Sequence, residues 1–126
     1  MHKSGLAGFI IDCRTDDLER AAQFWSAALG YELKPKHEET SPLYRCMLTD
    51  ELGLHVEVQK VEHDSRVHLD IETDDIEAEA QRLEALGAKR IDKVHTWIVM
   101  EAPTGQRFCI VRPQNKQFAA QANVWK

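Results

Sequence analysis

Twice along this chain, a strand-like pattern of hydrophobic and polar positions is followed by a helix-like pattern. Residues 54–59 and 67–72 alternate between apolar and polar, which is typical of strands with one buried face. A mainly apolar stretch at residues 6–13 also reads as a strand. Helical spacing follows over residues 16–29 and again over residues 74–86, each beginning with aspartates and followed by a glycine. The pattern therefore predicts two strand–helix segments of the same design.

The two segments are also similar residue by residue. Residues 10–19 align with residues 68–77 without a gap. Internal repetition of this kind indicates one structural module used twice. One mismatch bears on chemistry, because His68 stands where the first copy has Ile10.

Each copy continues with further strands, so both modules read strand–helix–strand–strand–strand. The remaining predicted strands are residues 31–36, 43–48 and 54–59 in the first copy and 89–93, 96–101 and 107–111 in the second. Pro35 indicates an edge strand or an early end, because proline cannot donate to a ladder. We expect an α+β fold of two paired β-α-β-β-β modules, residues 6–60 and 66–112, followed by a short tail at residues 113–126.

The second face of each predicted sheet has no helix to cover it. Alternation places six polar residues there: His55, Glu57, Gln59, His68, Asp70 and Glu72. Burying unpaired charge is costly, so this face is too polar for a sealed core. We expect a curved mixed sheet around a wet concave cavity, with Glu72 solvated near the end of its strand.

Composition narrows the class of protein. The chain has 126 residues, 43% of them hydrophobic and 29% charged, which fits one globular domain. Its net charge of -5 argues against a nucleic-acid partner, and no segment has the length of a membrane span. The start has no long apolar run, so we expect no signal peptide. Three unpaired cysteines indicate a reduced, cytoplasmic setting.

Several short motifs together resemble a known family. They are the two Thr-Asp-Asp-(Leu/Ile)-Glu helix starts, Phe24-Trp25 with Ala28-Leu29-Gly30-Tyr31, Leu86-Gly87-Ala88, and Ala102-Pro103-Thr104-Gly105. Over residues 6–112 the chain resembles the vicinal oxygen chelate superfamily, which includes glyoxalase I, bleomycin-resistance proteins, methylmalonyl-CoA epimerase and extradiol dioxygenases. The resemblance implies a small-molecule ligand in the concave cavity and a homodimer.

The resemblance also implies positions for metal ligands, one on the first and one on the last strand of each module. Those positions hold Ile10, Glu57, His68 and Cys109. The family's usual set is histidine or glutamine, glutamate, histidine and glutamate, so only Glu57 and His68 match. We take His68, Glu57 and Cys109 as candidate ligands of one divalent ion such as zinc or nickel. The alternative is a cavity wall with a histidine–carboxylate pair and a buried cysteine.

Two aspartates occupy equivalent positions in the repeat, Asp12 in the first module and Asp70 in the second. Either can act as a general acid or base in the cavity. Duplication favours a structural role instead, because a catalytic residue needs to occur only once. His55, Gln59, Trp97 and Tyr44 are candidate ligand-binding residues.

Three functions remain open at this point, one of which is an interaction domain with a degenerate site. The first is a glyoxalase-like lyase, isomerase or epimerase. A dioxygenase is the least favoured activity, because non-haem iron oxygenases use two histidines and one carboxylate. The second is a non-catalytic binder like the bleomycin-resistance proteins, in which an acidic groove near Trp97 holds a cationic drug.

Overall fold

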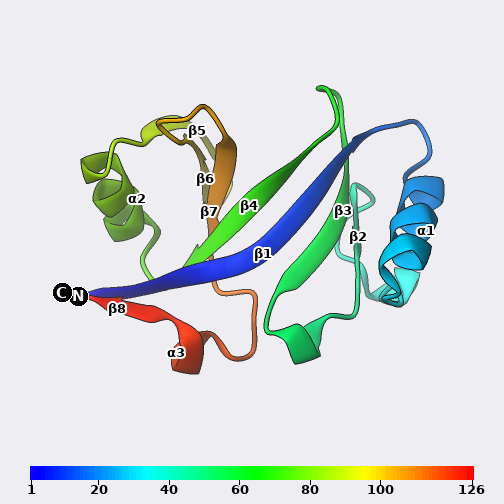
Figure 1. Ribbon diagram of the computed structural model, residues 1–126, viewed down its shortest axis with the longest axis horizontal. Coiled ribbons are helices and arrows are strands. Elements are labelled where there is room, and N and C mark those ends of the chain that lie inside the picture. Colours follow the sequence, from blue (N-terminus) through cyan, green and yellow to red (C-terminus); the bar gives the residue numbers. More distant parts are fainter. The chain divides into compact units, whose positions relative to one another are not determined.

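A computed structural model describes all residues, 1–126, and the chain forms two compact units. We call Phe9–Val67 the α1 unit, and Met1–Gly8 with His68–Lys126 the α2 unit, after the helix that each contains. Strand β1 (His2–Arg14) contributes its first residues to the α2 unit and its last residues to the α1 unit (Figure 1).

The α1 unit is a small sheet with one helix. Its elements are the end of β1, α1 (Leu18–Leu29), the 3₁₀ turn η1 (Lys36–Glu38), β2 (Tyr44–Cys46), the 3₁₀ turn η2 (Asp50–Leu52) and β3 (His55–Val61). The strand order is β2-β3-β1, and β2 pairs antiparallel with β3. Ala22 of α1 packs with Met47 and Val58 in the core, so the helix covers the face opposite His55 and Glu57.

The start of α1 differs from the prediction by a small shift. Asp17, not Asp16, is the N-cap, and its carboxylate accepts a hydrogen bond of 3.0 Å from the backbone N–H of Arg20. Gly30 ends the helix with a φ of 77°, as its place in the sequence predicts.

The strand predicted at residues 31–36 was wrong. Only Leu33 forms an isolated bridge, to Met47, and the chain then turns into η1 with Pro35 at its N-cap. Proline has no N–H and a fixed φ, so it cannot continue a ladder but suits the start of a helical turn.

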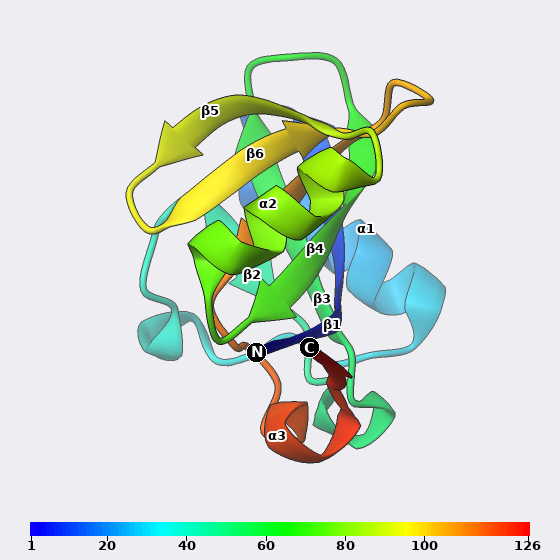
Figure 2. The same ribbon diagram turned by 90° about the vertical axis from the view of Figure 1, so that its left-hand side faces the viewer.

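The α2 unit has a larger sheet. Its elements are the start of β1, β4 (Arg66–Thr73), α2 (Ile76–Ala85), β5 (Lys89–Val94), β6 (Trp97–Glu101), β7 (Arg107–Val111), α3 (Phe118–Gln121) and β8 (Asn123–Trp125). The order is β1-β4-β7-β6-β5, with β4 and β7 parallel. Helix α2 lies across one face (Figure 2), where Ala80 and Leu83 pack on Met100 and Ile110. None of the helices combines the length and apolarity of a membrane span.

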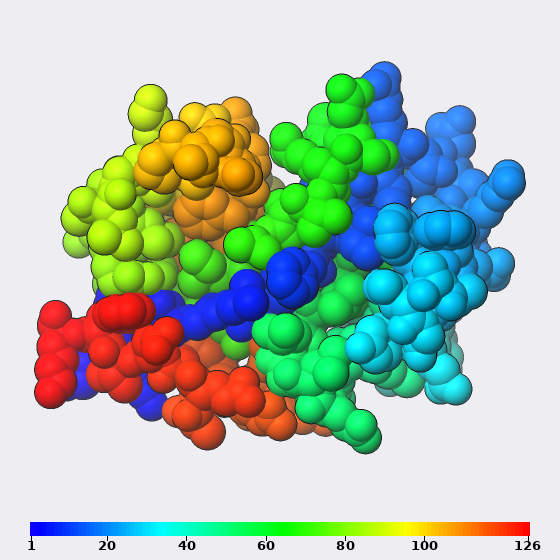
Figure 3. Space-filling model, viewed as in Figure 1, coloured from blue at the N-terminus to red at the C-terminus, as the bar shows by residue number.

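Both ends of the described chain belong to the α2 unit, and they lie side by side (Figure 3). The segment predicted as a tail forms α3 and β8, and β8 pairs with residues 2–4 of β1. Trp125 Nε1 donates a 2.7 Å hydrogen bond to Ser4 Oγ. Strand β1 therefore begins at His2 rather than at residue 6, because a partner strand from the far end of the sequence extends its ladder.

Candidate functional site

Strands β4 and β7 bring three potential metal ligands together on the face opposite α2. His68 and Asp70 are two residues apart on β4, so both point to the same face. Cys109 pairs with Asp70 in the ladder and therefore shares that face. One ligand atom from each of the three residues lies within 4.8 Å of the other two.

Asp70 is buried, yet its polar atoms are incompletely paired. The residue is 7% exposed, and its Oδ1 has no hydrogen bond. Nε2 of His68 lies 3.4 Å from Oδ1, a distance that suits a charge interaction but not an aligned hydrogen bond. Leaving a buried acceptor unsatisfied costs about 1–3 kcal/mol, and more for a charged group. A bound cation would relieve that cost.

The donor set suits a divalent metal ion. Imidazole nitrogen, carboxylate oxygen and thiolate sulfur are the ligands of zinc, at bond lengths of about 2.0–2.3 Å. Two ligands of one ion are thus at most about 4.6 Å apart, close to the 4.8 Å spread of the cluster. The unsatisfied Oδ1 of Asp70 is the observation in this structure that favours a cation there.

Strand β6 adds an aromatic side chain to the same face. Val99 pairs with Cys109, and Trp97 stands two residues before Val99, so its half-buried ring faces the same side. The ring centroid of Trp97 lies 5.7 Å from that of His95. Trp97 therefore offers an apolar surface on the same face of the sheet as the His68, Asp70 and Cys109 cluster.

The prediction that Glu72 is solvated was wrong. Glu72 is 4% exposed, and its carboxylate accepts hydrogen bonds from the backbone N–H groups of Gln114 and Asn115 at 2.7 and 3.0 Å. The side-chain amide of Asn115 adds a third at 2.9 Å. The segment after β7 returns over the strand end and supplies these donors, which the local pattern around Glu72 does not reveal.

The α1 unit contains a different histidine–carboxylate–cysteine group. Oε1 of Glu57 lies 2.7 Å from Nε2 of His55 and accepts a hydrogen bond of 3.0 Å from the Cys46 thiol. Burial would raise the pKa of Glu57, but the contacts with His55, Cys46 and Lys34 outweigh it and hold the pKa below its ordinary value. Burial and the neighbouring Glu57 and Glu39 raise the pKa of the Cys46 thiol, which therefore stays protonated and donates.

The predicted metal set is thus distributed over the two units. His68 and Cys109 belong to the α2 unit, whereas Glu57 belongs to the α1 unit and has His55 and Cys46 as partners. Asp70 is the third potential ligand beside His68 and Cys109, whereas the sequence predicts a catalytic or structural role for it. The shared strand face of His68 and Asp70 is the signal that points to this grouping.

The other predicted site residues lie in the α1 unit. Gln59 donates a 2.9 Å hydrogen bond to the Tyr44 hydroxyl, its partner across the β2–β3 ladder. Asp12 is 2% exposed, and its Oδ2 lies 3.9 Å from His63 Nε2 and 3.8 Å from Arg66 Nε. These ion-pair distances are compatible with a structural role for Asp12, and a catalytic role stays a prediction.

A pocket of about 270 Å³ lies between α1, η1 and β2, and Tyr44, one of the predicted ligand-binding residues, is part of its lining. Arg45 lines it, is almost fully buried, and pairs with Glu19 and Glu39. Because these two carboxylates already balance Arg45, the charge of the pocket favours no particular ligand. The cluster at His68, Asp70 and Cys109 remains the stronger candidate.

Residues 8–111 match the family described as the glyoxalase-like domain. The chain belongs to that family. No curated protein matches the sequence. Among solved structures, the hypothetical protein BH1468 from Bacillus halodurans C-125 is similar, with a TM-score of 0.62 and 12% identity over 89% of this chain and 96% of that one.

The match confirms the predicted glyoxalase-like α+β fold and the resemblance to the vicinal oxygen chelate superfamily. At 12% identity the structural likeness concerns the fold alone. One fold hosts many chemistries, so function must be argued from the site.

Proposed function

We propose that this glyoxalase-like protein binds a small organic ligand on the helix-free face of the α2 unit, beside a divalent metal ion held by His68, Asp70 and Cys109. The observation that carries the proposal is the buried Oδ1 of Asp70, which lacks a hydrogen bond within a cluster of three metal-ligand types. His68 and Cys109 also stand at positions where the family resemblance implies ligands.

The chemistry that suits this face is of the lyase or isomerase kind. A metal ion there would supply Lewis acidity that polarises a carbonyl oxygen. His68 and Asp70 can hold or move a proton at the 3.4 Å contact between Nε2 and Oδ1, since imidazole and carboxylate are common acid–base groups. The half-buried Trp97 ring offers an apolar wall that can orient a ligand and exclude water.

A second candidate function is metal-free binding of a cationic organic ligand. It is favoured by the position of Asp70 and Trp97 on one face of the sheet. A buried carboxylate and an aromatic ring both attract a cation, and the attraction strengthens when water is excluded. In this case the ligand itself would satisfy Asp70.

Metal analysis of untagged protein tests the first proposal. We expect close to one zinc-like ion per chain after supply and dialysis, and its loss in His68→Ala. His37→Ala is a matched control, because His37 is exposed in η1 and lies in the other unit. Absence of bound metal under every supply, together with a melting temperature that ignores chelator, would contradict it.

Thermal shift separates the two functions, because a ligand that binds only the folded state raises the melting temperature. We would compare small thiol adducts and acyl-CoA compounds with cationic antibiotics, each with and without metal. Metal-dependent shifts with carbonyl compounds support the first function. Shifts with cationic compounds that persist in chelator and disappear in Asp70→Asn support the second.

A further inference from the structure

The sulfur of Cys109 influences which metal ion the cluster can bind. We infer that the His68, Asp70 and Cys109 cluster selects a thiophilic divalent ion of the zinc or cobalt(II) type over magnesium or manganese. This inference rests on the proposed function, since it concerns the same cluster. It goes further by assigning the chemical class of the ion and by naming Cys109 as the residue that determines it.

The ladder between β4 and β7 keeps the sulfur in place. Asp70 pairs with Cys109, and the pairs on either side are Leu69 with Phe108 and Ile71 with Ile110. Phe108 and Ile110 belong to the core under α2. A slip of one residue would turn Cys109 toward α2 and bring an apolar side chain to the site. Core packing therefore holds the Cys109 thiol beside Asp70.

The donor types decide the metal class. Carboxylate and water ligands suit magnesium and manganese, whereas thiolate and imidazole suit zinc and its neighbours. Two of the three side chains in this cluster, His68 and Cys109, are of the second kind. The family resemblance implies a glutamate where this chain has Cys109, so the preference expected here belongs to this chain's own sequence.

Binding through Cys109 also requires deprotonation. The thiol loses its proton when the sulfur–metal bond forms, and one proton is released to solvent for each ion bound. Cys109 is only partly buried, so ions and reagents can reach it. Uptake of the ion should therefore acidify a weakly buffered solution.

Cobalt(II) titration of metal-free protein tests the inference without any assay of activity. We expect a thiolate-to-cobalt charge-transfer band in the near ultraviolet that saturates near one ion per chain and is abolished by zinc but not by excess magnesium or manganese. Cys109→Ser should remove the band and weaken zinc binding by at least the 10–100-fold that loss of a supporting contact costs. Cys109→Asp should keep an ion but accept manganese.

Cys46→Ser is the matched control, because a serine hydroxyl can still donate to Glu57 in the α1 unit. It should leave the band and the zinc affinity unchanged. Circular dichroism and melting curves show whether each variant is folded. The cobalt charge-transfer band of the wild-type protein tests the inference even if a variant fails to fold.

The possible failures are distinguishable. If wild-type protein binds cobalt without the band, or prefers manganese to zinc, the assignment of Cys109 is overturned while a metal site survives. If no ion binds at all, the metal part of the proposed function fails together with this inference. A band that persists in Cys109→Ser and vanishes in Cys46→Ser would place the site elsewhere and also overturn it.

Discussion

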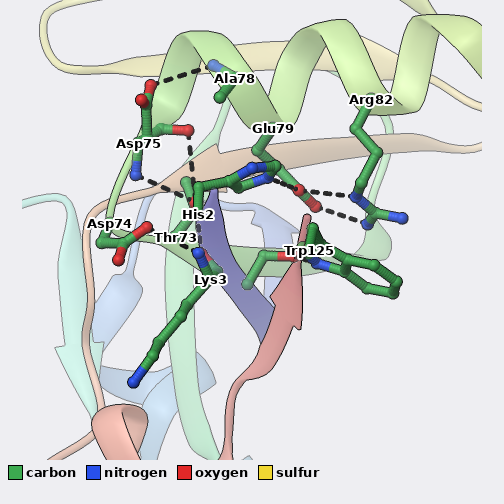
Figure 4. Close-up of polar contacts among 10 residues, drawn as sticks. His2, Lys3, Thr73, Asp74, Asp75, Ala78, Glu79, Arg82 and Trp125 are labelled. Carbon is green, nitrogen blue, oxygen red and sulfur yellow. Dashed lines mark hydrogen bonds and ion pairs between the residues drawn. The ribbon is translucent and has the colours of Figure 1, made fainter.

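Two buried carboxylates of the α2 unit have opposite surroundings. Glu79 on α2 is fully buried, and Arg82 donates two hydrogen bonds of 2.8 Å to it, while His2 Nε2 lies 2.8 Å from its Oε1 (Figure 4). Asp70 on β4 is buried almost as deeply, but its Oδ1 has no hydrogen bond. A buried charge is costly unless it is paired. The chain pairs Glu79 with hydrogen bonds from its own groups, whereas Oδ1 of Asp70 has only the 3.4 Å contact with His68 Nε2.

The contacts of Glu79 explain why both ends of the described chain lie on α2. The Arg82 guanidinium that holds Glu79 also lies 3.9 Å from the ring centroid of Trp125, in a cation–π contact. Trp125 in turn donates to Ser4. One buried carboxylate thus connects β1, α2 and β8, which is a structural role. The comparison teaches that burial alone does not mark a site, and that Asp70 differs from Glu79 in the missing hydrogen bonds at its Oδ1.

The largest expected effect is at Glu79. Glu79→Gln should lower the free energy of unfolding by about 3 kcal/mol at neutral pH, because the partly exposed Arg82 and His2 both lose the buried carboxylate that they contact. Glu84→Gln on the same helix is the control, since its pair with Arg90 is exposed and should matter by about 0.5 kcal/mol or less. Chemical denaturation measures both. Equal losses would mean that the Glu79 contacts are not structural.

A smaller loss is expected at Trp125. Trp125→Leu keeps an apolar side chain but removes the stacking on Arg82 and the hydrogen bond to Ser4, so stability should fall by about 1.5 kcal/mol. The same denaturation experiment measures it. Because β8 pairs with β1 and not with β4 or β7, zinc affinity should not change. A change in affinity would show that the two regions are coupled.

Substitution of Asp70, unlike that of Glu79, should not lower the stability of the metal-free protein. Asp70→Asn removes a buried charge whose Oδ1 lacks a hydrogen bond, so the metal-free protein should be unchanged or gain about 1 kcal/mol. Metal binding should be lost at the same time. Melting curves in chelator and metal analysis provide the two readings. A loss of stability like that of Glu79→Gln would mean that Asp70 is structural too, and would remove the main support for the proposed function.

The pH dependence gives the smallest effect. Burial would raise the pKa of Glu79, but the hydrogen bonds from Arg82, His2 and Ser4 outweigh it, so the folded-state pKa is lower than the ordinary value. A lowered carboxyl pKa stabilises the fold above the unfolded pKa, and this stability is lost as the pH falls through the folded pKa. The cost of Glu79→Gln should therefore be smaller near pH 3 than at pH 7. An equal cost at both would contradict this role.

Most of the architecture could be predicted because it rests on local patterns. The predicted strand at residues 107–111 matches β7, and both helices end within a few residues of their predicted limits. Alternation also places His68 and Asp70 on one face. These features depend on period, capping and turn residues, which neighbouring positions in the chain determine.

The missed features all depend on partners that are distant in sequence. Leu33 makes only a bridge, because Pro35 interrupts the ladder before a strand can form. Glu72 is buried by donors from residues 114 and 115, and β8 extends β1 from more than a hundred positions away. The partnership of Glu57 with Cys46 needs the β2–β3 register, which no local pattern supplies.

The sequence by itself determined the family, the repeated module and the presence of His68 against Ile10, because these are properties of residue order. Tertiary structure decided which buried carboxylates are satisfied. Glu79 and Asp70 read alike along the chain as acids beside apolar positions, but only folding brings Arg82 and His2 to one and leaves the other beside His68 and Cys109. The free energy of a buried charge depends on neighbours in space, and that dependence identifies the site.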